Sequence, residues 1–246
     1  MSFVVFGIPI HWYGVMVAFG VLAGFHLAVR RTKRYGLKSD IIERLLPWLL
    51  LGGIVGGRLY HVVHYIRYYE EDPVRIFMVW QGGLGIFGAL FGGGIALWFG
   101  CVYYRVSQGK LLDLLAPSLA LGQAIGRIGN YFNAEGFGPP TTFPWGIAIA
   151  KNQRPPEFYE TRYFHPTFLY ESLWLAGGTL LMLKLEKNGV SRGVLFGCYL
   201  IWFGLGRFFL EFLRLDTAMV GTLKVAHVLA LFCVIWGSLY IVEKTA

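Results

Sequence analysis

Charged side chains are scarce in this sequence. Asp, Glu, Lys and Arg together make up 15% of the 246 residues, whereas 56% of the residues are hydrophobic, and the mean hydropathy is +0.54. Soluble domains carry about 25% charged residues. The shortage of charge therefore excludes a soluble globular protein and predicts an integral membrane protein.

Sequence signatures of cofactor binding are also missing. The chain contains no Walker loop, no dinucleotide fingerprint, no Ser-His-Asp set and no zinc motif. Its three cysteines, Cys101, Cys198 and Cys233, all lie in apolar runs without the paired spacing of a disulfide or a zinc site. The cysteines therefore look like small buried hydrophobic residues, and we expect no bound metal.

Basic residues outnumber acidic ones, which gives a formal net charge of +8. A basic chain suits contact with the anionic headgroups of membrane lipids, but basic cytoplasmic loops produce the same excess. We expect membrane lipids and no nucleic acid among the partners. The N-terminal stretch lacks a basic region and a small-residue cleavage site, so we expect the first apolar segment to be retained.

Glycine, by contrast, is abundant, with 33 residues. Glycines four residues apart recur in the apolar segments, and this spacing lets membrane helices pack closely. The pairs are Gly20/Gly24, Gly52/Gly56, Gly53/Gly57, Gly88/Gly92 and Gly122/Gly126. The pattern predicts an all-α polytopic bundle, and we expect a single transmembrane domain over residues 1–246.

Seven segments are long and apolar enough to span a bilayer, which takes about 20 residues. They cover residues 13–29, 46–65, 82–103, 111–131, 167–183, 194–213 and 223–242. Basic residues in the connections indicate the orientation, because cytoplasmic loops collect Lys and Arg. With the N-terminus outside, twelve basic residues lie in the inner connections and six in the outer ones. The sequence therefore predicts seven transmembrane helices with the N-terminus out and the C-terminus in.

The stretch from Gly122 to Gly138, GQAIGRIGNYFNAEGFG, places polar groups at membrane depth. An arginine in hydrocarbon costs about 2.5–3.5 kcal/mol on insertion scales, so Arg127 needs a partner, a ligand or water. Arg127 and Asn130 are three residues apart and share a helix face. Two interpretations remain: a structural arginine paired with a neighbouring carboxylate, or part of a binding site.

In the second segment, Arg58, His61 and His64 are spaced by three. A His-x-x-His pair can bind metal, but no third ligand is evident at a matching depth. We expect Arg58 to be paired in the core and the histidines to lie near the outer interface. The stretch 80–89, WQGGLGIFGA, has four glycines and is a poor helix. It indicates a bent entry or re-entrant backbone, which either packs closely on other helices or contacts a ligand.

Residues 134–166 form a long extramembrane segment, which we expect on the outer side. They hold six of the ten prolines, and loops of this length are often functional. The segment leads into HPTFLYE, in which His165 lies at the mouth of the bundle and Glu171 about one helical turn deeper. Histidine side chains titrate near neutral pH. His165 is therefore either a functional group or an interfacial cap.

The sixth apolar segment carries GLGRFFLEFLR, in which Arg207 and Glu211 are four residues apart and can pair along one helix face. Arg214 follows at its outer end. Arginine presents a rigid fork of donors that matches phosphate, and two or three arginines near the outer leaflet suit a phospholipid headgroup. The residues alone thus indicate a membrane protein that handles an anionic lipid.

Four stretches, HWYG, GRIGNYFNAEGFG, HPTFLYES and GLGRFFLEFLR, resemble motifs of bacterial prolipoprotein diacylglyceryl transferases and occur in the family's order. The resemblance runs from about residue 7 to residue 240. It implies transfer of the diacylglyceryl group of phosphatidylglycerol to the thiol of the lipobox cysteine of a prolipoprotein, in the bacterial cytoplasmic (inner) membrane and without a cofactor. The products would be a thioether-linked prolipoprotein and glycerol phosphate.

The resemblance also implies roles for individual residues, since Arg127 matches the family's signature arginine and would bind the lipid phosphate. We expect catalytic roles for Arg127, Arg207, His165 and Tyr13. We expect substrate contacts from Arg127, Asn130, Asn133, Glu135, Gly138, Arg207, Glu211, Glu171 and Arg58. Within these sets, His165 is our candidate acceptor of the thiol proton, and Tyr13 would orient the substrate.

Two positions depart from the family pattern. Many members carry a histidine, proposed to activate the thiol, where this chain has Phe87, and a tyrosine where it has Phe203. Phenylalanine neither accepts nor donates a proton, so the identity of the general base stays open. Two other functions also remain open: a lipid or anion transporter, which needs a path to both faces, and a catalytically silent homologue that binds lipid or prolipoprotein.

Overall fold

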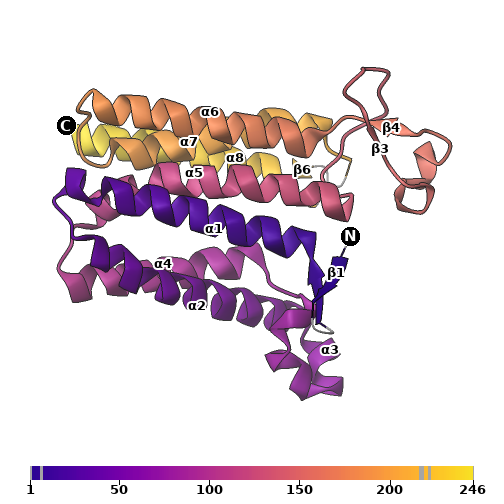
Figure 1. Ribbon diagram of the computed structural model, residues 1–246, viewed down its shortest axis with the longest axis horizontal. Helices are drawn as coiled ribbons and strands as arrows, with labels where there is room; N and C mark the ends of the chain where they lie inside the picture. The colour runs from indigo at the N-terminus through magenta and orange to yellow at the C-terminus, as the bar shows by residue number, and fades with distance from the viewer. Residues whose placement is uncertain (1, 6–7, 216–218, 221–222, 246) are drawn as a thin grey trace. The chain divides into compact units, whose positions relative to one another are not determined.

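The computed structural model describes residues 2–5, 8–215, 219–220 and 223–245, most of which are helical (Figure 1). Among these residues, six helices are long and apolar enough to cross a membrane. They are α1 (Trp12–Arg31), α2 (Ser39–His64), α4 (Ile86–Tyr104), α5 (Gln108–Asn133), α7 (Val194–Leu210) and α8 (Val225–Thr245). The protein is therefore a polytopic membrane protein. A further long helix, α6 (Thr167–Lys187), lies outside this set.

The chain divides into two compact units, one formed by Met1–Ala28 with Leu112–Ala246 and the other by Val29–Leu111. Besides most of α1 and most of α5, the first unit holds α6, α7, α8, β1 (Ser2–Val5), β2 (Ile8–His11), β3 (Ile147–Ala148), η4 (Lys151–Gln153), η5 (Pro156–Phe158), β4 (Tyr163–Phe164), η6 (Glu211–Leu213), β5 (Met219–Val220) and β6 (Leu223–Lys224). The second unit holds η1 (Thr32–Tyr35), α2, α3 (Ile66–Glu71), η2 (Pro73–Phe77), η3 (Val79–Gln81) and α4.

Several helix ends differ from the apolar segments predicted by sequence. The second helix begins at Ser39 rather than at 46, because its polar first turns are helical too and carry an ion pair of 3.8 Å between Asp40 and Arg44. Conversely, α4 begins at Ile86 rather than at 82. Gly82 and Gly83 adopt φ values of 90° and 76°, which a helix does not allow. Counting apolar residues locates the hydrocarbon-spanning part of a helix and misses both effects.

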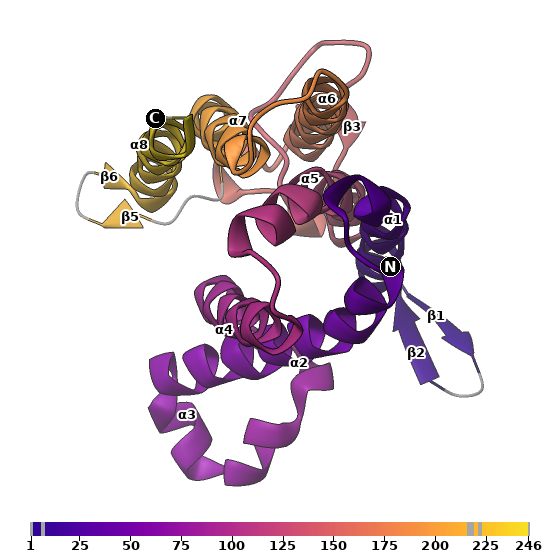
Figure 2. The ribbon, with the colours of Figure 1, turned by 90° about the vertical axis from the view of Figure 1, so that its left-hand side faces the viewer.

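Glycines bring helix backbones into close contact within each unit. In the first unit, a Cβ added to Gly20 of α1 would lie 2.5 Å from the carbonyl oxygen of Gly122 of α5. In the second unit, a Cβ on Gly52 of α2 would lie 2.6 Å from the carbonyl oxygen of Gly92 of α4, and these two helices run side by side in both views (Figures 1 and 2). The packing predicted from glycine spacing is confirmed at these pairs, whereas Gly126 faces open space.

A buried core joins α5, α6 and α7 in the first unit. It contains Ala116, Ala120, Met182, Leu195, Tyr199 and Leu200. Polar bonds fix the helices around it: Gln123 donates to the Tyr199 hydroxyl at 2.8 Å, and the Asp113 carboxylate accepts from the backbone N–H of Gly193 and of Phe196 at the start of α7. These bonds satisfy N–H groups that a helix start leaves unpaired. This core fixes the positions of α5, α6 and α7 relative to one another.

The long segment 134–166 folds back on itself in a short antiparallel pair, with Ile147 opposite Phe164 and Ala148 opposite Tyr163. Phe164 is fully buried, and Ile149 is 5% exposed. The segment therefore has a small hydrophobic centre of its own. Its chain ends are held by the last turn of α5 and the first turn of α6, which brings residues 134–138 and 165–168 together.

Candidate active site

A buried carboxylate, Glu171 of α6, gathers three arginines. Its Oε2 lies 2.7 Å from Nε of Arg127 on α5. Its Oε1 accepts a hydrogen bond from Nη1 of Arg207 on α7 at 3.1 Å and another from Nη1 of Arg214, which follows η6, at 3.2 Å. Only 7% of the Glu171 side chain is exposed. The charge of this carboxylate is therefore balanced by guanidinium groups rather than by water.

Arg207 has a second acidic partner, as its spacing in the sequence predicts. Its Nη2 lies 2.8 Å from Oε2 of Glu211, and Glu211 is fully buried. We call Arg127, Arg207, Arg214, Glu171 and Glu211 the arginine cluster. Its three guanidinium groups and two carboxylates leave a formal net charge of +1. Lys224, whose Nζ donates to the backbone oxygen of Glu211 at 3.0 Å, adds a positive charge beside it.

Interhelical hydrogen bonds set the register that brings these groups together. The hydroxyl of Ser172, next to Glu171, donates to the carbonyl oxygen of Ala124 on α5 at 2.7 Å. Between α6 and α7, the indole N–H of Trp174 donates to the carbonyl oxygen of Trp202 at 2.9 Å, and that of Trp202 donates to the carbonyl oxygen of Trp174 at 2.8 Å. The two rings stack at a centroid distance of 4.4 Å. These interhelical hydrogen bonds, which lie about one helical turn from Arg127, Glu171 or Arg207, thus fix the two arginines relative to Glu171.

A small hollow opens beside the cluster and has a polar and an apolar part. Arg127, Glu171 and Arg207 form the polar part, and the apolar part is lined by Trp174, Leu175, Phe203, Gly206 and Leu210. A ligand that carries a charged phosphate next to a hydrocarbon chain would match both parts of the hollow. Phe203, one of the two departures from the family pattern, contributes a ring without a hydroxyl to this wall.

The amides and the acid that follow Arg127 form a separate polar group at the end of α5. Nδ2 of Asn130 lies 3.5 Å from Oε2 of Glu135, and Nδ2 of Asn133 lies 3.4 Å from Oε1. Glu135 is exposed. Ala134 and Gly136, with φ values of 52° and 65°, turn the chain back here. Asn130, Asn133 and Glu135 are thus held together, and their bonds are with each other rather than with the arginine cluster.

Gly138 has no room for a side chain. A Cβ there would lie 2.5 Å from the carbonyl oxygen of Leu213 and 2.9 Å from the Cγ2 of Thr167. Its N–H donates to the carbonyl oxygen of His165 at 2.8 Å. Gly138 therefore joins the end of the α5 signature to the start of α6 and to η6, the elements that carry Glu171 and Glu211.

His165 belongs to a chain of three hydrogen-bonded polar side chains. Its Nδ1 is 3.1 Å from the Tyr170 hydroxyl, which also accepts a hydrogen bond of 2.8 Å from Nε1 of Trp145. Tyr170 is on α6 and Trp145 belongs to the long segment. His165 is thus anchored from both sides, with its backbone held by Gly138 and Pro139.

Tyr13 and Arg58 occupy two further positions. Tyr13 of α1 packs on α5, close enough to Gly129 that a Cβ there would lie 3.1 Å from Cδ2 of the ring, and 38% of Tyr13 is exposed.

Arg58 belongs to the second unit, where its guanidinium group donates to backbone carbonyls. The expectation that Arg58 is paired in the core is confirmed, although its partners are carbonyl oxygens. Phe87, also in the second unit, packs on Tyr60 at a centroid distance of 5.8 Å.

Arg214 was missing from the residues expected in the site, although the sequence carries a signal for it. It lies seven residues after Arg207 and three after Glu211, so a continuing helix would place all three on one face. Tyr170 and Trp145 have no comparable signal, because their contact joins positions 25 residues apart across an irregular segment.

Comparisons with known proteins place this geometry in context. The sequence model of the family described as prolipoprotein diacylglyceryl transferase matches residues 1–243. A relative from Thermosynechococcus vestitus is 41% identical over 233 residues, which cover 94% of this chain and 87% of the relative. One from Nostoc is 43% identical over 230 residues, with coverages of 91% and 81%, and one from Halalkalibacterium halodurans is 38% identical over 229 residues, with coverages of 92% and 79%. Each of the three is named phosphatidylglycerol–prolipoprotein diacylglyceryl transferase.

Proposed function

The chain belongs to the prolipoprotein diacylglyceryl transferase family, and we propose that it transfers the diacylglyceryl group of phosphatidylglycerol to the lipobox cysteine of a prolipoprotein. In this reaction the cysteine sulfur attacks the carbon of the diacylglyceryl group that bears the phosphate ester. The carbon–oxygen bond breaks as the carbon–sulfur bond forms, glycerol phosphate leaves with the electron pair, and the thiol gives up its proton.

The observation that carries the proposal is the junction of three arginines at Glu171. A phosphodiester carries one negative charge, and both the arginine cluster, with a formal net charge of +1, and the neighbouring Lys224 favour its binding. Arg127 contacts Glu171 through Nε, and we propose that its two Nη groups bind the phosphate. Arginine recognises phosphate through such a pair of parallel donors. The apolar wall of Trp174 and Leu210 then faces the glyceride.

Arg127 and Arg207 would also stabilise the leaving group. Negative charge grows on the phosphate as the carbon–oxygen bond breaks, and preorganised positive groups in a water-poor site act most strongly on such charge. Glu171 and Glu211 hold the two guanidinium groups in place before the lipid arrives, so little rearrangement accompanies the reaction. We therefore propose that Arg127 and Arg207 are catalytic, with Glu171, Glu211 and Arg214 holding them.

The thiol must lose its proton, because the thiolate is the attacking species. We propose His165 as the acceptor, directly or through water, with Tyr13 orienting the substrate. His165 is fixed by Tyr170 and Trp145, and Phe87 and Phe203 carry no group that could accept a proton. We further propose that Asn130, Asn133 and Glu135 contact substrate at the end of α5, and that Gly138 supports this site through its close approach to α6 and η6.

We propose that α6 is a seventh spanning helix in a single transmembrane domain. Its 21 residues give a length of about 31 Å, close to the hydrocarbon thickness of about 30 Å. Its charged Glu171 is balanced by arginines, and Lys184 and Lys187 lie in its last turn. With the N-terminus outside, the basic connections lie on the inner side, and the long segment 134–166 faces outward from the bacterial inner membrane.

Release of glycerol phosphate tests this function. Purified protein in vesicles that contain phosphatidylglycerol is given a lipobox peptide, and both glycerol phosphate and the thioether product are measured. We expect the two products in equal amounts and only with a peptide that contains cysteine. Lipid movement between leaflets without either product would instead indicate a transporter. Peptide or lipid binding without turnover would indicate a silent homologue.

A further inference from the structure

In the second unit, the guanidinium group of Arg58 is surrounded by backbone oxygens. Nε donates to Ile76 at 2.9 Å, and Nη1 donates to Gly82 at 2.6 Å and to Gly83 at 3.1 Å. Nη2 donates to Met78 at 3.3 Å and also to Arg75. An arginine has five N–H donors, and here all five point to carbonyls of residues 75–83. The side chain is buried, with 6% of Arg58 exposed.

These carbonyls belong to irregular backbone between two spanning helices. Residues 73–81 form the short 3-10 turns η2 and η3, and Gly82 and Gly83 have left-handed φ values. Irregular backbone cannot satisfy its own carbonyls, so water normally does so. In a membrane, each unsatisfied group costs several kcal/mol. Arg58 thus supplies from the protein the donors that water supplies elsewhere.

Several large apolar side chains of the same segment point outward. Phe77 and Trp80 are each 76% exposed, and Val74 is 60% exposed. Large aromatic groups this exposed are costly in water, where burying one is worth about 1.5–3 kcal/mol. Glu70 and Glu71, a few residues earlier, are also exposed. A segment that has bonded carbonyls, exposed aromatic rings and nearby charged groups is suited to the boundary between lipid and water.

Its placement on the unit agrees with this. Residues 65–81, which we call the arm, connect the end of α2 to the approach to α4, and both helices are candidate spans. The arm turns away from the α2 axis in Figure 1, and in Figure 2 it lies below α2 and α4. It therefore runs across the helix ends, as a segment along the membrane surface does.

Tyr69 fixes the arm to α2. Tyr69 is 3% exposed, its hydroxyl lies 2.9 Å from Nδ1 of His61, and its ring centroid lies 5.1 Å from Cζ of Arg58. The arm is thus held at the level of the last turns of α2 from two points, the Tyr69 ring and the carbonyls around Arg58.

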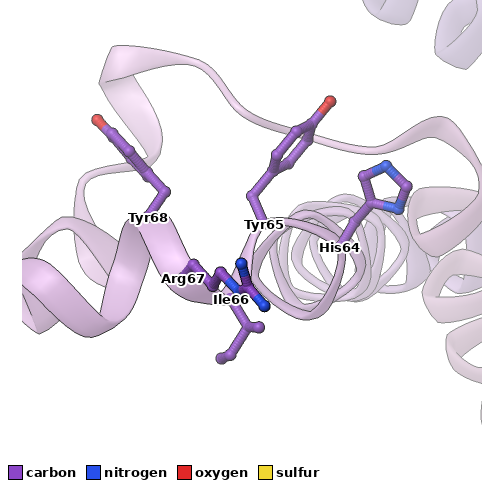
Figure 3. A pocket seen from close by; sticks show the side chains of 5 residues that line it. All are labelled: His64, Tyr65, Ile66, Arg67 and Tyr68. Carbon is purple, nitrogen blue, oxygen red and sulfur yellow. The ribbon is translucent and has the colours of Figure 1, made fainter.

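The base of the arm carries a hollow lined by His64, Tyr65, Ile66, Arg67 and Tyr68 (Figure 3). The hydroxyl ends of Tyr65 and Tyr68 point to the same side, and Ile66 points the other way. Tyrosines with one wet and one apolar end are enriched at the headgroup level of membranes, and an arginine there attracts anionic lipid. The hollow gives the arm a polar face next to its apolar one.

We propose that the arm is an interfacial anchor that places Phe77 and Trp80 in the phospholipid at the end of α2, and that Arg58 permits this by replacing water at the arm's carbonyls. Arg58 is then a positioning residue of the membrane-bound fold. This role is independent of the transferase chemistry proposed above.

Spin labels test the proposal in full-length protein reconstituted in phosphatidylcholine–phosphatidylglycerol vesicles. Labels go on Phe77→Cys, Trp80→Cys and, as a water-exposed reference, Gln153→Cys, after the three native cysteines are replaced by alanine. We expect collisions with oxygen to dominate at 77 and 80, and collisions with a water-soluble nickel chelate to dominate at 153. A nickel-dominated signal at 77 and 80 overturns the proposal. Protection from both reagents also overturns it, because a protein partner or second copy then covers the arm.

Arg58→Gln tests the role of the arginine, with Arg44→Gln, at an exposed position near the other end of α2, as matched control. Arg58→Gln should raise nickel collisions at 77 several-fold, and Arg44→Gln should leave them unchanged. An unchanged signal in both variants overturns the role of Arg58. If Arg58→Gln does not fold, the depth of Trp80 still decides the anchor: brominated lipid should quench the fluorescence that is lost in Trp80→Phe, and absence of that quenching overturns it.

Discussion

The Nε atom of Arg127 on α5 lies 2.7 Å from Oε2 of Glu171 on α6. The other oxygen of the same carboxylate accepts hydrogen bonds from Arg207 and Arg214. One buried carboxylate thus holds together three guanidinium groups that come from separate elements and would otherwise repel one another. The ability of this site to bind a phosphate depends on Glu171 as much as on the arginines.

We expect Glu171→Gln to impair both stability and transfer. The amide keeps the shape of the side chain but removes the charge that holds the three arginines, and breaking a buried ion pair from one side costs about 3–5 kcal/mol. Thermal unfolding in detergent and the rate of glycerol phosphate release measure the two effects. Glu157→Gln, in an exposed position of the long segment, is the control. A variant at 171 that melts and turns over like the control contradicts the role of Glu171.

The sequence indicates the partners of the site only where they are local. Arg207 and Glu211 are four residues apart, and their ion pair is present at 2.8 Å. Arg127 at membrane depth requires a partner, but the choice of Glu171 depends on the register of α5 against α6, which Ser172 and Ala124 fix. No periodicity in the sequence encodes that contact between helices.

Arg58 also has partners that the sequence does not identify. Its depth in an apolar segment predicts a buried partner, and that much is confirmed. Its partners are carbonyls of a turn 17 to 25 residues away, and every residue type has a carbonyl, so residue identity cannot reveal them. The poor helix predicted over residues 80–89 is confirmed at 82–85, where it depends on glycine's local backbone preference. It is wrong for 86–89, which already belong to α4.

His165→Gln should change the pH dependence of the reaction. If His165 accepts the thiol proton, the His165→Gln variant loses the part of the pH–rate profile that the imidazole provides. Tyr170→Phe keeps His165 but removes the hydroxyl 3.1 Å from its Nδ1, so it should weaken the same part of the profile. The measurement is the rate of peptide lipidation across pH. If His165→Gln retains both the rate and the profile of the wild type, His165 is not the base.

Phe87→His is a complementary change, because it restores the group that many family members carry at this position. We expect the rate near neutral pH to rise if the chain works without a dedicated base there. If the rate of peptide lipidation stays the same, proton transfer belongs entirely to other residues.

Gly138→Ala should destabilise the protein by about 1–3 kcal/mol, the usual cost of overpacking. Its Cβ would lie 2.5 Å from the carbonyl oxygen of Leu213, so the start of α6 or η6 must move. Gly94→Ala, which meets nothing within 4 Å, should melt like the wild type. Equal melting temperatures for the two variants argue against a close approach at Gly138.

Cysteine labelling in intact cells tests the proposed orientation. Gln153→Cys, in the long segment, should react with a membrane-impermeant maleimide in whole cells, and Lys38→Cys, between η1 and α2, should react only after permeabilisation. The two positions serve as controls for each other. The reverse pattern places the N-terminus inside.

Arg127→Lys tests most directly whether the arginine cluster binds the phosphate of the lipid. Lysine keeps the charge and loses the paired donors of the guanidinium group, so we expect glycerol phosphate release to fall by about 10²–10³-fold, and Arg127→Gln should be slower still. Arg162→Lys, at an exposed position of the long segment, should keep the wild-type rate. Near-normal release of glycerol phosphate by Arg127→Lys and Arg127→Gln, in protein that is folded and in the membrane, would contradict the assignment.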